Sequence, residues 1–180
     1  MLKNRKEAID LARWSLNKSV KGSEDPAPEL TDSYFYEKAG VFVTLKKNGI
    51  LRGCIGVIEA EDSLLNNIIT SARNSALNDW RFPNVRPEEV DKLEVEISIL
   101  SPFEYTSRED IKIGEHGLIV EGKGKSAIYL PQVATEQGWT FDNWLTSLCE
   151  KAGLPHNFWK TEDARFKTCT ADVFSEWDVV

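Results

Sequence analysis

A cysteine and an arginine two residues apart in a glycine-rich run are the side chains of this sequence best suited to chemistry. They are Arg52 and Cys54 in the run Leu-Arg-Gly-Cys-Ile-Gly at residues 51–56. A cysteine thiolate is a nucleophile, and a nearby guanidinium favours the thiolate over the thiol. Gly53 and Gly56 remove side chains around the sulfur, so a ligand or another backbone segment can approach closely. The run could therefore join a reactive thiol to an anion-holding arginine.

The same residues also fit a purely structural role. Free cysteine is often buried and then behaves as a small apolar residue. An arginine can lie along an apolar neighbour, here Leu45, while its charged head reaches water. The residue types alone leave a reactive site and a packed strand about equally supported.

A β-hairpin is expected to carry this run. Residues 41–47 are rich in β-branched and aromatic side chains, which favour a strand. The dipeptide Asn48-Gly49 follows, and it suits the type I′ turn of a two-residue hairpin loop. Residues 50–58 then form the return strand. This hairpin is the clearest local signal of the chain.

The hairpin also predicts where each side chain of the run points. A two-residue turn places Arg52 opposite Leu45 and Cys54 opposite Val43. Because side chains alternate along a strand, Arg52, Cys54 and Gly56 are expected on one face. The other face is expected to carry Leu51, Gly53 and Ile55. The first face is the predicted site and the second the predicted packing surface.

The rest of the chain mixes helices and strands without a regular βαβ order. Apolar residues follow helical spacing at 5–20, 62–79 and 141–152, and strand-like patterns occur at 93–99, 118–130 and 166–177. The 118–130 pattern is interrupted by Gly-Lys-Gly-Lys, which indicates a second hairpin. These patterns predict an α+β fold with antiparallel sheets flanked by helices.

Three further residues are candidates for a site. Asp79 and Arg81 lie at the end of the predicted 62–79 helix, where such a pair is commonly a structural ion pair or cap. Arg81 could instead join Arg52 in holding an anionic group such as a carboxylate. His116, in a glycine-flanked turn, could act as general base for Cys54 if the fold brings the two together.

Four segments of the sequence resemble motifs of the AMMECR domain family, in the order in which the family has them. Residues 51–56 match its hallmark hexapeptide at all six positions. The other segments are Asp-Trp-Arg-Phe-Pro at 79–83, Gly-Glu-His-Gly at 114–117, and Leu-Pro-Gln-Val-Ala at 130–134 with Gly-Trp at 138–139. The resemblance spans most of the chain, and the hexapeptide is highly specific.

The resemblance implies a single AMMECR-type domain over residues 1–180, built of two unequal lobes, each with an antiparallel sheet. The larger lobe is expected to hold both termini, and the hexapeptide side chains are expected to point into the cleft between the lobes. Microbial members are known as protein A of the AmmeMemoRadiSam grouping, beside a Memo-like protein and a radical-SAM protein. Those two proteins are therefore the expected partners, although the family has no established reaction.

Composition narrows the class of function. The net charge of −7 and the pI of about 5.0 disfavour a nucleic-acid role, which depends on clustered lysine and arginine. Three cysteines without C-x-x-C spacing, and only two histidines, argue against disulfides and predict no metal site and no cofactor. No segment approaches the roughly 20 apolar residues that span a bilayer, so we expect a cytoplasmic protein that binds no membrane.

Three functions remain in order of preference. The first is a binding module that holds a peptide, a partner protein or a metabolite around residues 51–56, with Arg52, Gly53, Gly56, Asp79 and Arg81 as ligand-binding residues. The second is an enzyme that uses Cys54 as nucleophile or redox thiol and His116 as base. The third is a scaffold in which the hexapeptide only packs.

Overall fold

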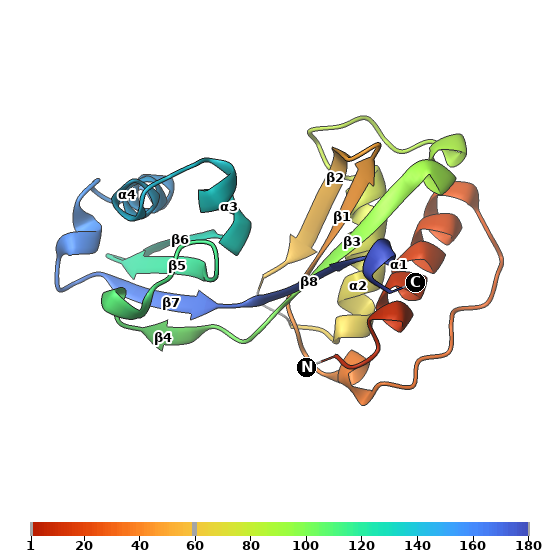
Figure 1. Ribbon diagram of the computed structural model, residues 1–180, viewed down its shortest axis with the longest axis horizontal. Coiled ribbons are helices and arrows are strands. Elements are labelled where there is room, and N and C mark those ends of the chain that lie inside the picture. Colours follow the sequence, from red (N-terminus) through yellow and green to blue (C-terminus); the bar gives the residue numbers. More distant parts are fainter. Residues whose placement is uncertain (1, 59–60, 180) are drawn as a thin grey trace. The chain divides into compact units, whose positions relative to one another are not determined.

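The computed structural model describes residues 2–58 and 61–179, which form two compact units (Figure 1). The first unit runs up to Leu100 and resumes at Asp172, and the second spans Ser101–Ala171. Each unit has one four-stranded antiparallel sheet together with helices. The α+β fold predicted from the sequence is therefore confirmed.

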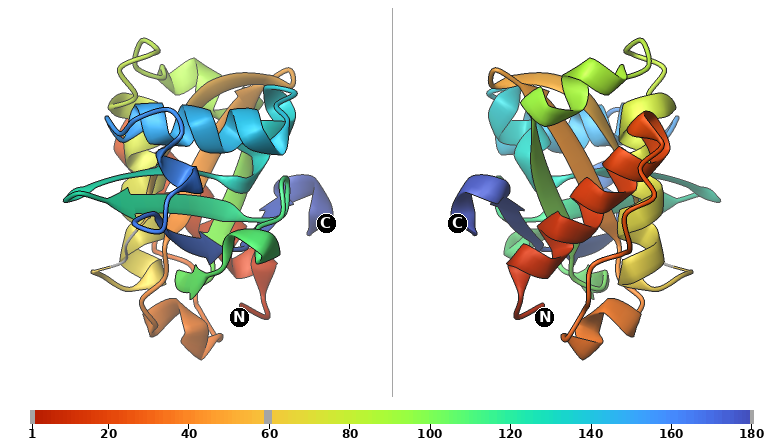
Figure 2. Two further views of the ribbon diagram at one scale, coloured as in Figure 1. Left: turned by 90° about the vertical axis from the view of Figure 1, so that its left-hand side faces the viewer. Right: turned by 90° about the vertical axis from the view of Figure 1, so that its right-hand side faces the viewer.

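The sheet of the first unit has the strand order β2-β1-β3-β8. Its strands are β1 (Val41–Lys47), β2 (Ile50–Val57), β3 (Leu93–Leu100) and β8 (Ala171–Ser175). Two helices, α1 (Arg5–Leu16) and α2 (Leu64–Leu77), cover one face of this sheet (Figure 2). Side chains of both helices and of β1 and β3 form one apolar core. Strand β2, which carries residues 51–56, lies at one edge of the sheet.

Both helices begin at the capping residues typical of a helix start. The Asn4 side chain accepts the backbone N–H of Glu7, and Ser63 accepts that of Asn66. After α1, a π-helical turn, η1 (Asn17–Lys21), continues to Gly22 in a left-handed conformation. The helix predicted at 5–20 thus ends in a wider turn.

The second unit packs its helices on a sheet of strand order β4-β7-β5-β6. Its elements are β4 (Glu104–Thr106), β5 (Gly117–Gly122), β6 (Lys125–Tyr129), α3 (Pro131–Glu136), α4 (Phe141–Lys151) and β7 (Arg165–Cys169). The pairing of β5 with β6 confirms the second predicted hairpin. Fully buried Trp144 of α4 packs in the core of this unit.

Short 3-10 helices join these elements: η2 (Ser33–Tyr36), η3 (Pro87–Lys92), η4 (Arg108–Asp110), η5 (Phe158–Lys160) and η6 (Glu176–Asp178). The strand-like pattern at 166–177 is divided among β7, β8 and η6, and β7 and β8 lie in different sheets. The strand-like character predicted for this range thus holds up to Ser175, but it belongs to two separate strands. Alternation alone cannot show that a chain leaves one sheet and enters another.

The β1–β2 hairpin has the predicted turn but a different register. Asn48 and Gly49 both adopt positive φ, as a type I′ turn requires. Beyond the turn the register shifts, so Cys54 lies opposite Thr44 and Gly53 opposite Leu45. Arg52 is the extra residue of this bulge. The predicted partners of Arg52 and Cys54 were therefore wrong.

The bulge also changes which residues share a face. Cys54 and Gly56 lie on one face, as predicted, while Gly53 lies on the core face opposite buried Leu45. Leu51 is paired with Lys46 and so joins the face of Cys54. Arg52 leaves that face, and the common face predicted for Arg52 and Cys54 is wrong. One inserted residue reverses the alternation for every residue on the turn side of it.

Within residues 2–58 and 61–179, no helix is both long enough and apolar enough to cross a bilayer.

Candidate functional site

Cys54 lies on strand β2 and is partly buried. Its Sγ accepts a hydrogen bond from the Thr44 hydroxyl at 3.3 Å, across the pair that the shifted register creates. Burial raises the pKa of the Cys54 thiol above its ordinary value. The hydrogen bond from Thr44 and the charge of Arg81 lower the pKa of the thiol, but they offset only part of the effect of burial. Cys54 is thus held as a neutral thiol at neutral pH, contrary to the depressed pKa expected of a nucleophile.

Asp79 and Arg81 form hydrogen bonds with the backbone of Cys54 along the unpaired edge of β2. The Asp79 carboxylate accepts the Cys54 N–H at 2.8 Å, and Arg81 Nη2 donates to the Cys54 carbonyl at 3.0 Å. The two side chains bind each other through Nε at 2.9 Å and Nη2 at 2.7 Å. A neighbouring strand would offer the same acceptor and donor. We call Asp79 and Arg81 the edge clamp, because they occupy the outward-facing groups of one residue of an edge strand.

Asp79 is the buried half of the edge clamp, with 4% of its surface exposed. Its hydrogen bonds from Arg81 and from the Cys54 N–H lower the pKa of Asp79 to about 2. The Arg81 side chain is 41% exposed and lies against the Phe82 ring at 5.5 Å. Its Nη1 atom makes no hydrogen bond to any residue that the structure describes. Arg81 therefore keeps a donor for a carboxylate from outside.

Ser75 joins helix α2 to the same part of β2. Its hydroxyl accepts the Ile55 N–H at 2.8 Å and donates to the Val43 carbonyl at 2.7 Å. The helix is so close that a Cβ at Gly53 would collide with the Ser75 carbonyl oxygen. Gly53 therefore serves the approach of another backbone segment, which was one of the two interpretations left open by the sequence.

Gly56 has a similar explanation. It lies opposite Phe42, and a Cβ at this position would collide with the Phe42 ring and with the Val41 carbonyl oxygen. The ring thus fills the space that a side chain would take. Both glycines of the hexapeptide are accounted for by close packing within the first unit.

Arg52 is engaged by the segment before η3. Its guanidinium contacts the Glu89 carboxylate at 3.1 Å and donates to the carbonyls of Pro83 and Asn84 at 2.8 and 3.3 Å. Lys47 also binds Glu89, at 2.8 Å, and these two cations with the Arg86 N–H lower the pKa of Glu89 to about 2. The Arg52 side chain is 14% exposed. Its geometry is that of a residue that holds a loop.

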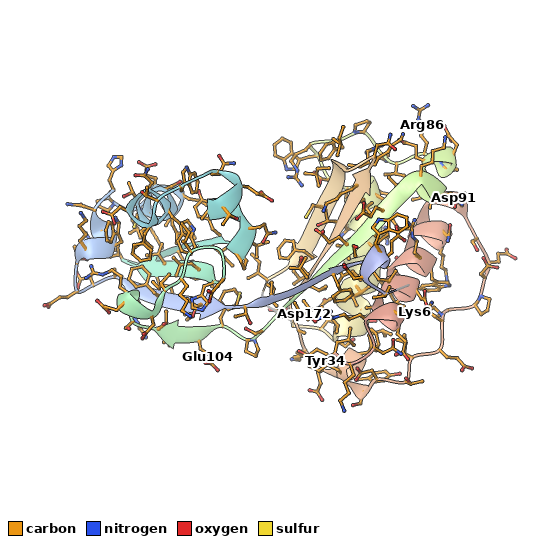
Figure 3. The ribbon with its side chains drawn as sticks, viewed as in Figure 1. Lys6, Tyr34, Arg86, Asp91, Glu104 and Asp172 are labelled. Atoms are coloured by element: carbon orange, nitrogen blue, oxygen red, sulfur yellow. The ribbon has the colours of Figure 1, made fainter. Side chains whose placement is uncertain are left out.

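Arg86 shows the contrast within the same segment. It points away from the sheet and is 76% exposed (Figure 3). Its only ion pair among the described residues is a loose one with Glu88 at 3.7 Å. Arg52 is therefore a half-buried cation that holds a loop, whereas Arg86 is a solvated one.

His116 belongs to the second unit, and its own turn uses one of its ring nitrogens. Nδ1 accepts the Lys112 N–H at 3.2 Å. A neutral imidazole that accepts at Nδ1 carries its proton on Nε2, so neither nitrogen offers a free lone pair. The role of His116 as general base for Cys54 stays a prediction.

Three residues important to this surface were missed by sequence reasoning. Trp80 stands between the edge-clamp residues and is 90% exposed, while Thr44 and Ser75 bind the thiol and the strand. The signal for Trp80 was present, since a tryptophan between two charged residues at a helix end has few apolar neighbours. No pattern in the sequence marks Thr44 or Ser75, because both depend on the register and on the helix approach.

The first unit also has a hollow that the hexapeptide does not line. This hollow, of about 730 Å³, is lined by α1, the 48–49 turn, residues 91–94 and the C-terminal segment. The described residues contain no group of three or more histidine, cysteine, aspartate or glutamate side chains able to hold a metal ion.

Known proteins match this chain over nearly its whole length. The AMMECR1 family model matches residues 9–174. A protein of Methanothermobacter thermautotrophicus is 39% identical over 176 residues, covering 93% of this chain and 92% of its own. Protein PH0010 of Pyrococcus horikoshii is 40% identical over 180 residues, covering 93% of this chain and 87% of its own.

The structural comparison agrees with the sequence comparison. The crystal structure of the uncharacterized protein PH0010 from Pyrococcus horikoshii superposes with a TM-score of 0.82 and 39% sequence identity. The match covers 97% of this chain and 93% of that one. The sequence, the fold and the matched length lead to the same conclusion, that this chain belongs to the AMMECR1 family.

Proposed function

We propose that the protein is a binding module, and that it takes a segment of a partner protein or peptide on the surface around the edge clamp. The observation that carries this proposal is Trp80, which is 90% exposed between the two clamp residues. A large aromatic side chain in water is costly, whereas exposed tryptophans are frequent centres of protein interfaces. Leu51, 39% exposed on the face of Cys54, adds apolar surface near the clamp.

The chemistry of the surface suggests what the partner segment contains. Trp80 and Leu51 favour an apolar side chain, and the unbonded Nη1 of Arg81 favours an acidic one. The partners to test first are the Memo-like and radical-SAM proteins that the family resemblance suggests. A retained metabolite would instead favour the small-molecule form of the same proposal.

The alternative function is a Cys54-dependent enzyme acting with such partners. The raised pKa of the Cys54 thiol and the bonded Nδ1 of His116 both speak against it. Thiol chemistry requires a thiolate, and burial disfavours the charged form. We therefore keep binding as the proposed function and assign no reaction.

Affinity capture with a matched pair of tryptophan variants tests the proposal. Trp177 is 70% exposed and lies in η6, so Trp177→Ala removes a comparable side chain away from the edge clamp. We expect the wild type and Trp177→Ala to retain the same partner, and Trp80→Ala to lose at least tenfold of it, because removing an interface tryptophan commonly costs about 2 kcal/mol or more. Equal retention by all three proteins, or no retained protein and no retained metabolite in native mass spectrometry, would contradict the proposal.

A further inference from the structure

A second feature of interest is a hollow in the second unit, which is independent of the edge clamp. Its volume is about 480 Å³, within the range of small-molecule sites. It is lined by residues 105–108 around β4 and η4, and by residues 159–162 and 164–166 around η5 and β7. Two segments that are distant in sequence therefore contribute to one recess.

The charged side chains of this hollow are mostly cations. Arg108 lines it from the first segment and Lys160 and Arg165 line it from the second, and Glu162 is the acid among the lining residues. The hollow thus carries a net charge of about +2, whereas the whole chain carries −7. A concentration of positive charge in an acidic protein indicates an anionic ligand.

Each of these cations lies over an aromatic ring. Arg108 and Lys160 lie over the Trp159 ring at 5.8 and 4.7 Å, and Arg165 lies over the Tyr105 ring at 4.4 Å. Trp159 is itself buried and fixed by a hydrogen bond from Nε1 to the Thr146 hydroxyl at 3.1 Å. Rings position a cation while leaving its N–H donors available, so the site is organised before a ligand arrives.

The donors of these cations are largely unused. Lys160 and Arg165 have no ion pair with any residue in the described ranges, and Arg108 has a loose one with its neighbour Glu109 at 3.5 Å. Lys167, next to the site, differs, because Glu121 binds it at 2.7 Å. The three lining cations are therefore the ones that a ligand can reach.

We infer that this hollow binds a small organic phosphate, with the phosphate on Arg108, Lys160 and Arg165 and the organic part against Tyr105. A phosphate monoester carries about −1.5 to −2 charges at pH 7, which matches the charge of the hollow. Arginine forks suit its paired oxygens. Tyr105 is 58% exposed even though Arg165 and Lys167 lie over its ring at 4.4 and 4.9 Å, and strand alternation puts its neighbour Glu104 on the other face of β4 (Figure 3).

Isothermal titration with AMP and with inorganic pyrophosphate at low salt tests this inference. We expect both probes to bind the wild type, and Lys160→Gln and Arg165→Gln each to weaken binding at least fivefold. Glu162→Gln should strengthen binding, because it removes the negative charge from the hollow. Lys112→Gln is the matched control, since Lys112 is exposed in the same unit outside the hollow, and it should leave binding unchanged.

Two results would overturn the inference. One is that neither probe binds at millimolar concentration, and the other is that binding persists unchanged in Lys160→Gln and Arg165→Gln. Binding of a single-stranded oligonucleotide that AMP does not displace would also overturn it, because the ligand would then be a polymer. Thermal melts of every variant establish that the fold is retained.

Discussion

At the residue scale, Asp79 is the side chain on which the edge clamp depends most. Its buried carboxylate accepts the Cys54 N–H and three N–H groups of Arg81, from the backbone and the guanidinium. Removing the Asp79 carboxylate leaves the Cys54 N–H and the Arg81 N–H groups without their acceptor, and an unsatisfied buried donor costs free energy. The sequence left a structural ion pair and a ligand-binding role both open for the Asp-x-Arg pair, and the structure shows the ion pair. That it binds the strand edge follows only from the fold.

The first prediction concerns the pH dependence of this residue. Because the pKa of Asp79 falls from 3.8 to about 2 on folding, its ionised form stabilises the protein above about pH 4. That stabilisation is lost as pH falls through 3.8 toward 2. Asp79→Asn should lower the free energy of unfolding at pH 7 by about 2 kcal/mol. The gap between variant and wild type should shrink near pH 2, as urea titrations would show.

Glu89 titrates in the same pH range, since its pKa is also about 2. Glu89 is therefore kept unchanged in both proteins, and only the difference between them is interpreted. A difference that stays constant from pH 7 to pH 2 would show that Asp79 acts through packing and not through its charge.

The second prediction concerns Cys54. Its raised pKa predicts that iodoacetamide modifies Cys54 more slowly at pH 7 than it modifies a free peptide thiol, and that the rate rises only at more alkaline pH. Peptide mapping separates it from Cys149 and Cys169, whose pKa values are also raised by burial. A Cys54 that reacts faster than the free thiol would revive the enzyme hypothesis.

At the element scale, the site arises where helix α2 meets the edge of the sheet. The Ser75 hydroxyl bonds both the Ile55 N–H and the Val43 carbonyl. The helix ends at Leu77, and Asp79, the first residue of the edge clamp, follows two residues later. The close approach requires Gly53. Helix and hairpin therefore both contact the strand segment that carries Cys54.

The third prediction compares two serines on α2. Ser75→Ala removes a hydroxyl that serves the Ile55 N–H and the Val43 carbonyl, and should cost about 1–3 kcal/mol of unfolding free energy. Ser71→Ala is the control, because the Ser71 hydroxyl is also buried but has no hydrogen-bond partner among the described residues. Ser71→Ala should be neutral or stabilising in the same denaturant titrations. Equal losses for both variants would contradict the role given to Ser75.

The hairpin shows what sequence could and could not predict at this scale. Asn48-Gly49 specified the turn, because few residue pairs tolerate positive φ at both positions. The bulge at Arg52 has no such local signature, although it lies next to Gly53, where α2 approaches β2 closely. The error moved Arg52 to the wrong face and hid the Thr44–Cys54 pair. The turn was predictable from two neighbouring residues, whereas the register of the strands was not.

At the scale of the whole molecule, family membership followed from four motifs in order, and the match over residues 9–174 confirms it. The fold class also followed, because hairpins without βαβ alternation leave few architectures. The function did not follow, since the superposed relative PH0010 is itself described as uncharacterized. The site must therefore be argued from its own residues.

The exposed tryptophans are informative at this scale too. Trp80 and Trp177 are 90% and 70% exposed, whereas Trp144 and Trp159 are buried in the core of the second unit. Only Trp80 lies beside the hexapeptide surface, between the residues that hold Cys54. The binding proposal therefore predicts that Trp80 contacts the partner and that Trp177 does not.

Photo-crosslinking from these two positions tests the proposal most directly. Benzoylphenylalanine is introduced in place of Trp80 or Trp177 in cells, and adducts are identified after irradiation. We predict one dominant protein or peptide adduct from position 80 that is absent from position 177, and lost when Leu51→Ala is added. The same adducts from both positions, or none from position 80, would contradict a partner-binding surface at the edge clamp.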